Sequence, residues 1–270
     1  MSSLVVLPAP LPSTAITLGQ LITDPISNTS ASLKPSKAPS SKHTTQSKHQ
    51  DTIAYDEDGR FTSTRFLSNL SREAPETTSN ILNLNAEQMT HSALDRPTTF
   101  FNQLRRDRTT RSFLRKMTQH QTPVYFVTGL QTVRKPIFER DSAGQDSTET
   151  APDSPHLRLP VRRVDSASNM ALQDGSEHDE YILAVELLKI KCRVGASNEP
   201  HTISDIEYSW SYHGLQDESE KEEQLSIGLG KPLEAKELKA LAGMPLNEDA
   251  AGERWAESSE YSDEDGIGGF

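Results

Sequence analysis

Six cationic side chains lie close together near the middle of the sequence, and their chemistry is the binding of anions. They are Arg105, Arg106, Arg108, Arg111, Arg115 and Lys116. Guanidinium and ammonium groups bind phosphate oxygens, which are offered both by the headgroups of acidic lipids and by nucleic acids. Phenylalanines at 100, 101 and 113 would suit a lipid surface. The remaining interpretation is a packed helix whose basic face is only solvated.

The distribution of charge favours a lipid surface over a nucleic acid as the partner of this segment. No signature of a DNA- or RNA-binding fold accompanies it, and the whole chain has a net charge of -11. Residues 99–140 hold nine Lys or Arg and two acids, whereas residues 217–270 hold five and fifteen. This asymmetry suggests a basic interaction surface and an acidic tail, unless both are merely solvated.

Other chemistry is not recognisable in the sequence. The eight histidines are scattered without the spacing of metal ligands, and the glycine stretches near 228 and 266 match no phosphate-binding or dinucleotide-binding motif. The acids are interpreted as lying in loops or in the tail. The single cysteine, Cys192, alternates with cations in an apolar row and is expected to be a small core residue. We therefore expect a protein that is not an enzyme, without catalytic, metal or cofactor sites.

The composition predicts one modest core. Only 33% of the 270 residues are hydrophobic, whereas ordinary domains contain roughly 45–50% apolar residues. A chain this polar leaves long segments with too little apolar surface to fold, and disorder is expected at 28–60, 141–155 and 257–270. The sequence has no apolar run of about 18 residues and no basic leader, so a cytoplasmic location is expected.

Three parts of the chain are expected. Residues 1–60 are interpreted as a mostly disordered N-terminal segment with a short apolar element at 15–22, residues 61–216 as an α+β core with long polar loops, and residues 217–270 as an acidic C-terminal tail with a short helix at 231–242. The predicted fold class is α+β, with one small twisted antiparallel sheet and a few helices, flanked by long disordered segments.

The basic residues are expected to lie on a helix at 99–118. Pro97 lies just before this segment and Thr98 can cap its first turn. Apolar residues at helix-like spacing also occur at 61–70 and 81–94, which favours helices there.

Two further segments are predicted to be strands. Residues 123–133 read PVYFVTGLQTV, a β-branched and aromatic run that is typical of a buried strand. Residues 156–164 alternate briefly between apolar and polar, and Pro160 confines them to the edge of a sheet or to a bulge.

An antiparallel hairpin is predicted at 181–212. Apolar and polar residues alternate up to Val194 and again from Ile206 to Tyr212, on either side of a loop that contains Gly, Asn and Pro. Ile190 and Trp210 are expected to be buried on its apolar face.

Three of these segments together resemble the pore-forming domain of gasdermins, in particular the short fungal gasdermin-like proteins. In that family a basic helix precedes a strand reading roughly v-Y-v-V-T-G-l, and a later strand has the form i-L-A-y-x-l. The resemblance covers mainly residues 100–135 and 181–212, and the amphipathic N-terminal helix of the family is not evident. The matching positions are Val124, Tyr125, Val127, Thr128, Gly129, Leu130, Ile182, Leu183, Ala184 and Leu187.

The resemblance implies a membrane-active, pore-forming protein of regulated cell death that relocates from the cytoplasm to a membrane on activation. The basic helix would contact acidic lipid headgroups, and the hairpins would provide inserted strands in a homo- or hetero-oligomer. The acidic tail at 217–270 would restrain the basic surface until it is removed or displaced. The alternative is a non-catalytic scaffold with a small α+β core that binds partners through its flanks.

Overall fold

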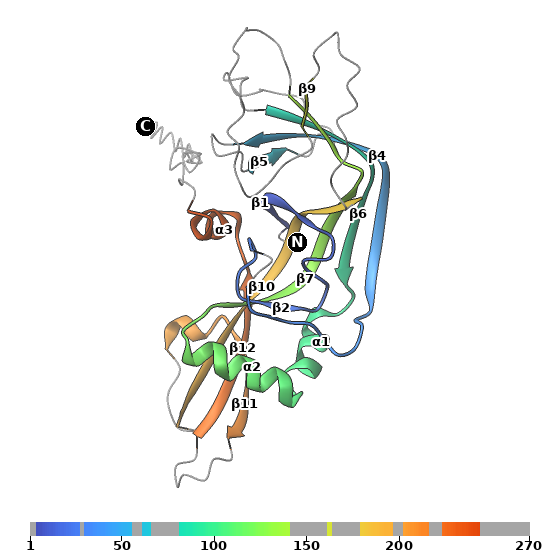
Figure 1. The fold of residues 1–270 in the computed structure, drawn as a ribbon. Coiled ribbons are helices and arrows are strands. Elements are labelled where there is room, and N and C mark those ends of the chain that lie inside the picture. The colour runs from blue at the N-terminus through green and yellow to red at the C-terminus, as the bar shows by residue number, and fades with distance from the viewer. Residues whose placement is uncertain are drawn as a thin grey trace, which may run out of the picture.

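The described residues form one large, mostly antiparallel open sheet with helices packed against it (Figure 1). The computed structural model describes residues 4–27, 30–55, 61–65, 81–140, 161–163, 179–196, 202–215 and 223–243. Twelve strands belong to this sheet, so the expectation of a small sheet is wrong, and the α+β class holds only in the sense that helices accompany a sheet that dominates the fold.

The strands have the following bounds and order. In sequence they are β1 (Leu4–Pro12), β2 (Leu21–Ile22), β3 (Ser32–Leu33), β4 (Ser41–Tyr55), β5 (Phe61–Arg65), β6 (Ile81–Leu94), β7 (Val124–Arg134), β8 (Ile137–Arg140), β9 (Val161–Arg163), β10 (Glu180–Ala196), β11 (Ser209–Leu215) and β12 (Glu223–Pro232). Across the sheet the order is β11-β12-β10-β7-β6-β4-β5, with β1 paired to β10, β2 to β7 and β8 to β6. The helices are α1 (Pro97–Leu104), α2 (Arg108–Gln119), α3 (Ala235–Leu241) and the short 3-10 helix η2 (Ile203–Asp205).

The centre of the sheet is β7, and the strand predicted at 123–133 is thereby confirmed. Residues 124–131 are all buried, because both faces of this strand are covered. Tyr125 and Val127 join an apolar cluster with β1 and α3. Val124 and Phe126 join a second cluster with α1 and α2. The sheet therefore has α1 and α2 on one face and α3 on the opposite face.

The predicted hairpin at 181–212 is wrong, because a third strand separates its two arms. β10 pairs with β12 through its C-terminal half, and β11 pairs with β12 rather than with β10. Ile190 is buried as expected, whereas Trp210 is only half-buried and Ile206 is exposed. The alternation from 206 to 212 is real, but its apolar side faces away from the cluster under α2.

The inserted strand β12 comes from the segment that was interpreted as tail. Leu225, Ile227 and Leu229 alternate into the cluster under α2. On the other face, a Cβ at Gly230 would lie 2.4 Å from the ring of Tyr208, so a larger residue there would force this aromatic ring to move. The helix predicted at 231–242 is confirmed only as α3 at 235–241, since Lys231 and Pro232 end β12, and its Leu238 is buried in the core. The core thus extends to residue 243, and the rest of the tail, with the disorder expected at 257–270, lies outside the described residues.

The N-terminal segment is also part of the sheet, so the disorder expected across 28–60 is wrong for residues 30–55, and the other residues of that range lie outside the described ones. β1 pairs with β10 and buries Val5 and Leu7. β4 pairs with β6 from Ser41 to Ala54, although residues 42–48 are all exposed. This stretch is a strand because of its backbone hydrogen bonds and has no apolar face, so apolar periodicity could not reveal it. The apolar element at 15–22 forms a strand only at Leu21–Ile22.

The helix predicted at 81–94 is wrong, and so is the helix predicted at 61–70 as far as residue 65, beyond which its residues lie outside the described ones. Residues 61–65 form β5 and residues 81–94 form β6. In β6 Leu84 and Ala86 are buried while Asn83 and Asn85 are partly exposed, so the period of two outweighs the helix-like spacing. Residues 161–163 form β9, which follows Pro160 and pairs in parallel with β8, in agreement with the strand expected at 156–164. The disorder expected at 141–155 lies outside the described residues.

Candidate anion-binding surface

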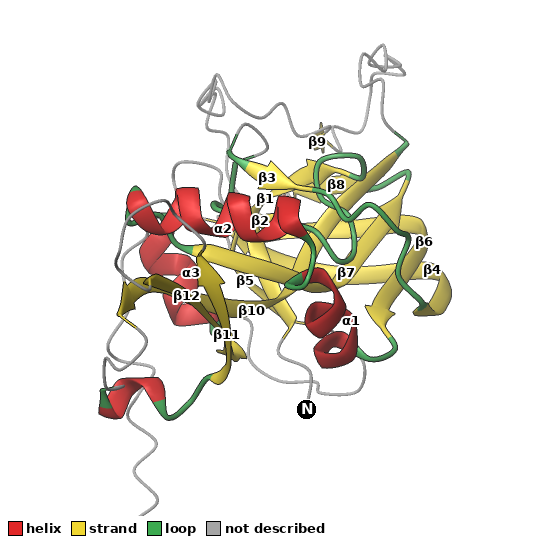
Figure 2. Cartoon of the chain, turned by 90° about the horizontal axis from the view of Figure 1, so that it is seen from below, coloured by secondary structure: helices red, strands yellow, loops and turns green. Residues whose placement is uncertain are grey.

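The basic segment forms two helices rather than one, because Asp107 starts a new helix. The backbone N–H of Thr110 donates a hydrogen bond to the Asp107 carboxylate at 3.2 Å, which caps α2. Residues 105–107 therefore form a corner between α1 and α2 (Figure 2). This corner places Arg105 and Arg106 between the two helices, and Arg108 begins the second.

One side of α2 is fixed to the sheet, and the cations occupy the rest of its circumference. Thr110, Leu114 and Met117 are the buried residues of this helix. Their spacing of three and four residues defines one stripe. Arg108 and Lys116 lie on the exposed side, away from this stripe. The apolar side of α2 packs against the sheet. The side that faces solvent can therefore bind a partner mainly through its positive charges.

Aromatic contacts hold α1 and the corner against the sheet. The ring of Phe101 lies 5.2 Å from that of Phe126 on β7. The guanidinium of Arg105 lies over the Phe101 ring at 5.9 Å, and it donates a hydrogen bond to the carbonyl oxygen of Ser209 at 3.4 Å. Burial, and then the positive charge of Arg106, lower the pKa of Arg105.

Arg105 and Arg111 lie close to the polar side of β11. The pKa of His213 on this strand is lowered, first by burial and then by the charges of Arg111 and Arg105. His213 is therefore neutral at pH 7 and adds no further positive charge. Sequence reasoning expected the apolar residues of β11 to be covered, whereas its serine and histidine side chains face the basic helix.

The six predicted residues lie at the end of α1, at the corner and along α2, and we call the surface that they contribute the α1–α2 basic surface. Arg106, Arg108 and Lys116 are exposed, whereas Arg105, Arg111 and Arg115 are half-buried. Within the ranges that the structure describes, no carboxylate forms an ion pair with Arg106, Arg108 or Lys116. These three cations are therefore available to an external anion.

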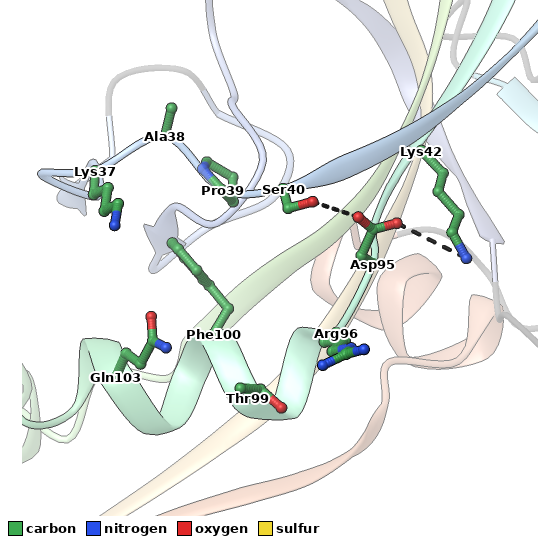
Figure 3. A pocket seen from close by; sticks show the side chains of 10 residues that line it. All are labelled: Lys37, Ala38, Pro39, Ser40, Lys42, Asp95, Arg96, Thr99, Phe100 and Gln103. Atoms are coloured by element: carbon green, nitrogen blue, oxygen red, sulfur yellow. Dashed lines mark hydrogen bonds and ion pairs between the residues drawn. The ribbon is translucent and has the colours of Figure 1, made fainter.

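An open cavity of about 640 Å³ extends the positive surface to the other end of α1 (Figure 3). Lys37, Lys42 and Arg96 line it together with a single carboxylate, Asp95. That carboxylate accepts a hydrogen bond from the hydroxyl of Ser40 and lies 3.8 Å from the Lys42 ammonium. The two lysines were missed as surface cations because the sequence placed them in a linker.

Three carboxylates are buried in strands or turns, contrary to the expectation that all acids lie in loops or the tail. Glu186 lies within β10, with a carboxylate oxygen 3.3 Å from the His91 ring. Asp51 on β4 lies 3.8 Å from His49. Asp205 is the third. Glu186 could have been identified from the sequence, because it is an acid inside an apolar run.

The single cysteine behaves as a core residue. Cys192 packs against the cluster under α2. Burial raises the pKa of its thiol to about 12, so the thiol stays protonated at neutral pH and is a weak nucleophile.

No group of three or more His, Cys, Asp or Glu side chains in the described part of the chain is arranged to hold a metal ion. None of the helices in the described ranges combines the length and the apolar character needed to cross a bilayer. In comparisons with known proteins, no family model and no curated protein matches the chain.

Proposed function

We propose that the protein is a gasdermin-like, membrane-active protein that binds acidic lipids through the α1–α2 basic surface and forms pores in regulated cell death. The observation that carries the proposal is the set of exposed cations, Arg106, Arg108 and Lys116, on helices whose apolar sides are packed against the sheet. The resemblance of residues 100–135 and 181–212 to gasdermins is the reason for proposing that the protein forms pores. The protein would move from the cytoplasm to the membrane and assemble there as a homo- or hetero-oligomer.

The geometry favours contact with lipid headgroups over insertion of the helix. Leu114 and Met117 would have to leave the core before α2 could enter the acyl region. The exposed cations need no such change, and each contact of this kind with an anionic leaflet contributes about 1 kcal/mol. Binding is therefore expected to be electrostatic and sensitive to salt.

The inserted strands of the proposal are assigned to β7 and β10 rather than to β4. A strand that crosses a bilayer needs about 9–11 residues with an apolar face. β7 has 11 residues and β10 has 17, and both are rich in apolar side chains. Residues 42–48 of β4 read KHTTQSK, which offers no face to lipid. The hairpin at 181–212 is replaced in this role, since β11 does not pair with β10.

The acidic restraint is confined to residues 244–270 in this proposal. Residues 223–243 belong to the core, so they cannot be displaced without loss of the fold. The segment 244–270 holds eight acids and one arginine. Its charge is opposite to that of the α1–α2 basic surface, and the attraction would weaken with salt because the screening length falls from about 10 Å at 0.1 M to about 3 Å at 1 M.

Replacing Arg106, Arg108 and Lys116 together by Ser is expected to weaken binding to acidic vesicles roughly 100-fold. Three lost contacts of about 1 kcal/mol each amount to about 3 kcal/mol, and about 1.4 kcal/mol corresponds to a factor of ten. The measurement is co-sedimentation of the full-length chain with phosphatidylcholine vesicles that do or do not contain phosphatidylserine, together with dye release from the same vesicles.

The matched control removes three other exposed cations. Lys34, Lys48 and Arg134 are exposed and lie outside both the two helices and the cavity beside α1, so their replacement by Ser changes the net charge equally. Equal losses in the two triple variants would mean that overall charge, and not this surface, drives binding. A protein that neither binds nor permeabilises acidic vesicles, either at full length or when it ends at Gly243, would refute the proposal and leave the scaffold alternative.

A further inference from the structure

The cavity beside α1 lies between two segments of the chain that are bonded to each other (Figure 3). One segment leads into β4, and the other joins the end of β6 to the first turns of α1. The backbone N–H of Asp95 donates a hydrogen bond to the carbonyl oxygen of Ser40 at 3.1 Å. In return, the hydroxyl of Ser40 donates one to the Asp95 carboxylate. These reciprocal bonds fix the two walls, so the cavity is preformed.

The size and the lining of this cavity suit a small polar molecule. Its volume of about 640 Å³ lies within the range of roughly 300–1,000 Å³ that is common for small-molecule sites. The half-buried rings of Phe100 and Pro39 form an apolar wall, against which a carbon skeleton can pack. Thr99 and Gln103 offer a hydroxyl and an amide for hydrogen bonds. The cavity is therefore larger and more varied in its chemistry than a single ion requires.

The charge of the cavity is positive. Three cations line it, namely Lys37, Lys42 and Arg96, together with the one carboxylate of Asp95, which leaves a net charge of about +2. That carboxylate is already engaged by the hydroxyl of Ser40 and lies 3.8 Å from the Lys42 ammonium. Neither Lys37 nor Arg96 forms an ion pair with any carboxylate of the described ranges. The protein thus leaves two cations of this cavity unbalanced.

The start of α1 reinforces these cations. Arg96 is the N-cap residue of this helix, and its side chain makes no capping hydrogen bond. The first turn contains no Asp or Glu. Backbone N–H groups at the start of a helix, and the positive end of its dipole, favour an anion. They add to the attraction of the lysines and the arginine, which define the site.

We propose that the cavity beside α1 is a binding site for a phosphate monoester. Such a group carries a charge of about −1.5 to −2 at pH 7, which matches the charge of the cavity, whereas a phosphate diester carries only about −1. The guanidinium of Arg96 can hold two phosphate oxygens at once, and the ammonium groups of Lys37 and Lys42 act as point charges. The carbon skeleton that bears the phosphate would lie against Phe100.

The inference goes beyond the proposed function and does not rest on it. None of the six cations of the α1–α2 basic surface lines this cavity. The phosphate monoester can belong to a soluble molecule or to a lipid headgroup, such as that of phosphatidic acid. In both cases the cavity recognises the monoester itself, whereas the α1–α2 basic surface attracts any acidic headgroup.

Calorimetric titration of the full-length chain and of the chain that ends at Gly243 tests the soluble source, with glycerol 3-phosphate as the probe and glycerol as the uncharged reference. Saturable binding of glycerol 3-phosphate alone is expected. Replacing Lys37 and Arg96 together by Ser should weaken it at least about tenfold, because two charged contacts are lost. The melting temperature should not fall, since both side chains are exposed and serine is a favoured N-cap residue.

Co-sedimentation tests the lipid source. Phosphatidylcholine vesicles that contain either phosphatidic acid or phosphatidylserine are compared at equal surface charge, because only phosphatidic acid offers a phosphate monoester. The wild type should prefer phosphatidic acid, and the variant without Lys37 and Arg96 should lose this preference. The matched control replaces Lys34 and Arg134 by Ser, which removes one lysine and one arginine outside the cavity. This control should behave like the wild type with both probes.

Binding from either source supports the inference if the loss is confined to the variant without Lys37 and Arg96. Three results would overturn it: a wild type that neither binds glycerol 3-phosphate nor prefers phosphatidic acid, a cavity variant that binds as well as the wild type, or equal losses in the cavity variant and its matched control. The variant without Arg106, Arg108 and Lys116 should still bind glycerol 3-phosphate, so failure of this inference is distinguishable from failure of the proposed function.

Discussion

A chain that ends at residue 216 is expected to show no cooperative unfolding transition, whereas a chain that ends at Gly243 should melt like the full-length protein. The shorter chain loses β12 and α3, with five buried side chains: Leu225, Ile227, Leu229, Leu233 and Leu238. Each contributes roughly 1.5–3 kcal/mol by burial, and their sum is comparable to the roughly 5–15 kcal/mol that stabilises a whole domain. Thermal melts followed by circular dichroism make the comparison.

The two truncations also distinguish loss of stability from loss of the proposed acidic restraint. The chain ending at Gly243 keeps every described element and removes the acidic residues 244–270, so it is the proper form for testing the proposed restraint. If the restraint exists, this chain binds acidic vesicles more tightly than the full-length protein at low salt. Equal binding by the two chains would contradict the proposed restraint. A folded chain of 216 residues with an unchanged melting temperature would show that β12 does not belong to the core.

Replacing Phe101 by Ala is expected to lower the free energy of unfolding by about 3–5 kcal/mol. Phe101 is fully buried, and its ring packs on Phe126 at the centre of the sheet. The change leaves a cavity under α1 and removes the ring beneath the guanidinium of Arg105. Urea denaturation measures the loss, through the shift of the midpoint at constant slope.

The neighbouring ring provides the control for this substitution. Phe100 is only half-buried, and its ring lies 6.4 Å from that of Phe126. Replacing Phe100 by Ala should therefore cost clearly less than replacing Phe101. The reverse order of the two costs would mean that α1 is held to the sheet by its other side.

The sequence predicts those elements in which the pattern of apolar and polar side chains shows which faces are buried. β7 could be predicted because both of its faces are buried and nearly all of its residues are apolar. β12 could not, because Gly228 and Gly230 read as a loop until the rings of Tyr208 and Trp210 are known to cover them. Residues 42–48 could not be identified as a strand either, since they pair with β6 through the backbone and have no apolar face.

That the six cations form a binding site remains a prediction. The cations are evident from the sequence, and the structure places them on two helices and the corner between them rather than on one helix. The division into two helices has a local cause, the preference of Asp107 for the start of a helix, which a search for apolar spacing does not detect. Which arginines are half-buried depends on β11, whose position follows from the unexpected strand β12.

The pairing of β1 with β10 has a consequence for the synthesis of the protein. Leu4 pairs with Glu186, which is 182 residues further along the chain. At about 5–20 residues per second, the ribosome needs about 10–40 s to make this distance. During that interval the apolar residues Val5 and Leu7 have no native partner strand, and an unpaired strand of this kind promotes aggregation between nascent chains. The abundance of the folded protein in cells therefore depends on keeping this segment apart from other chains until β10 has been made.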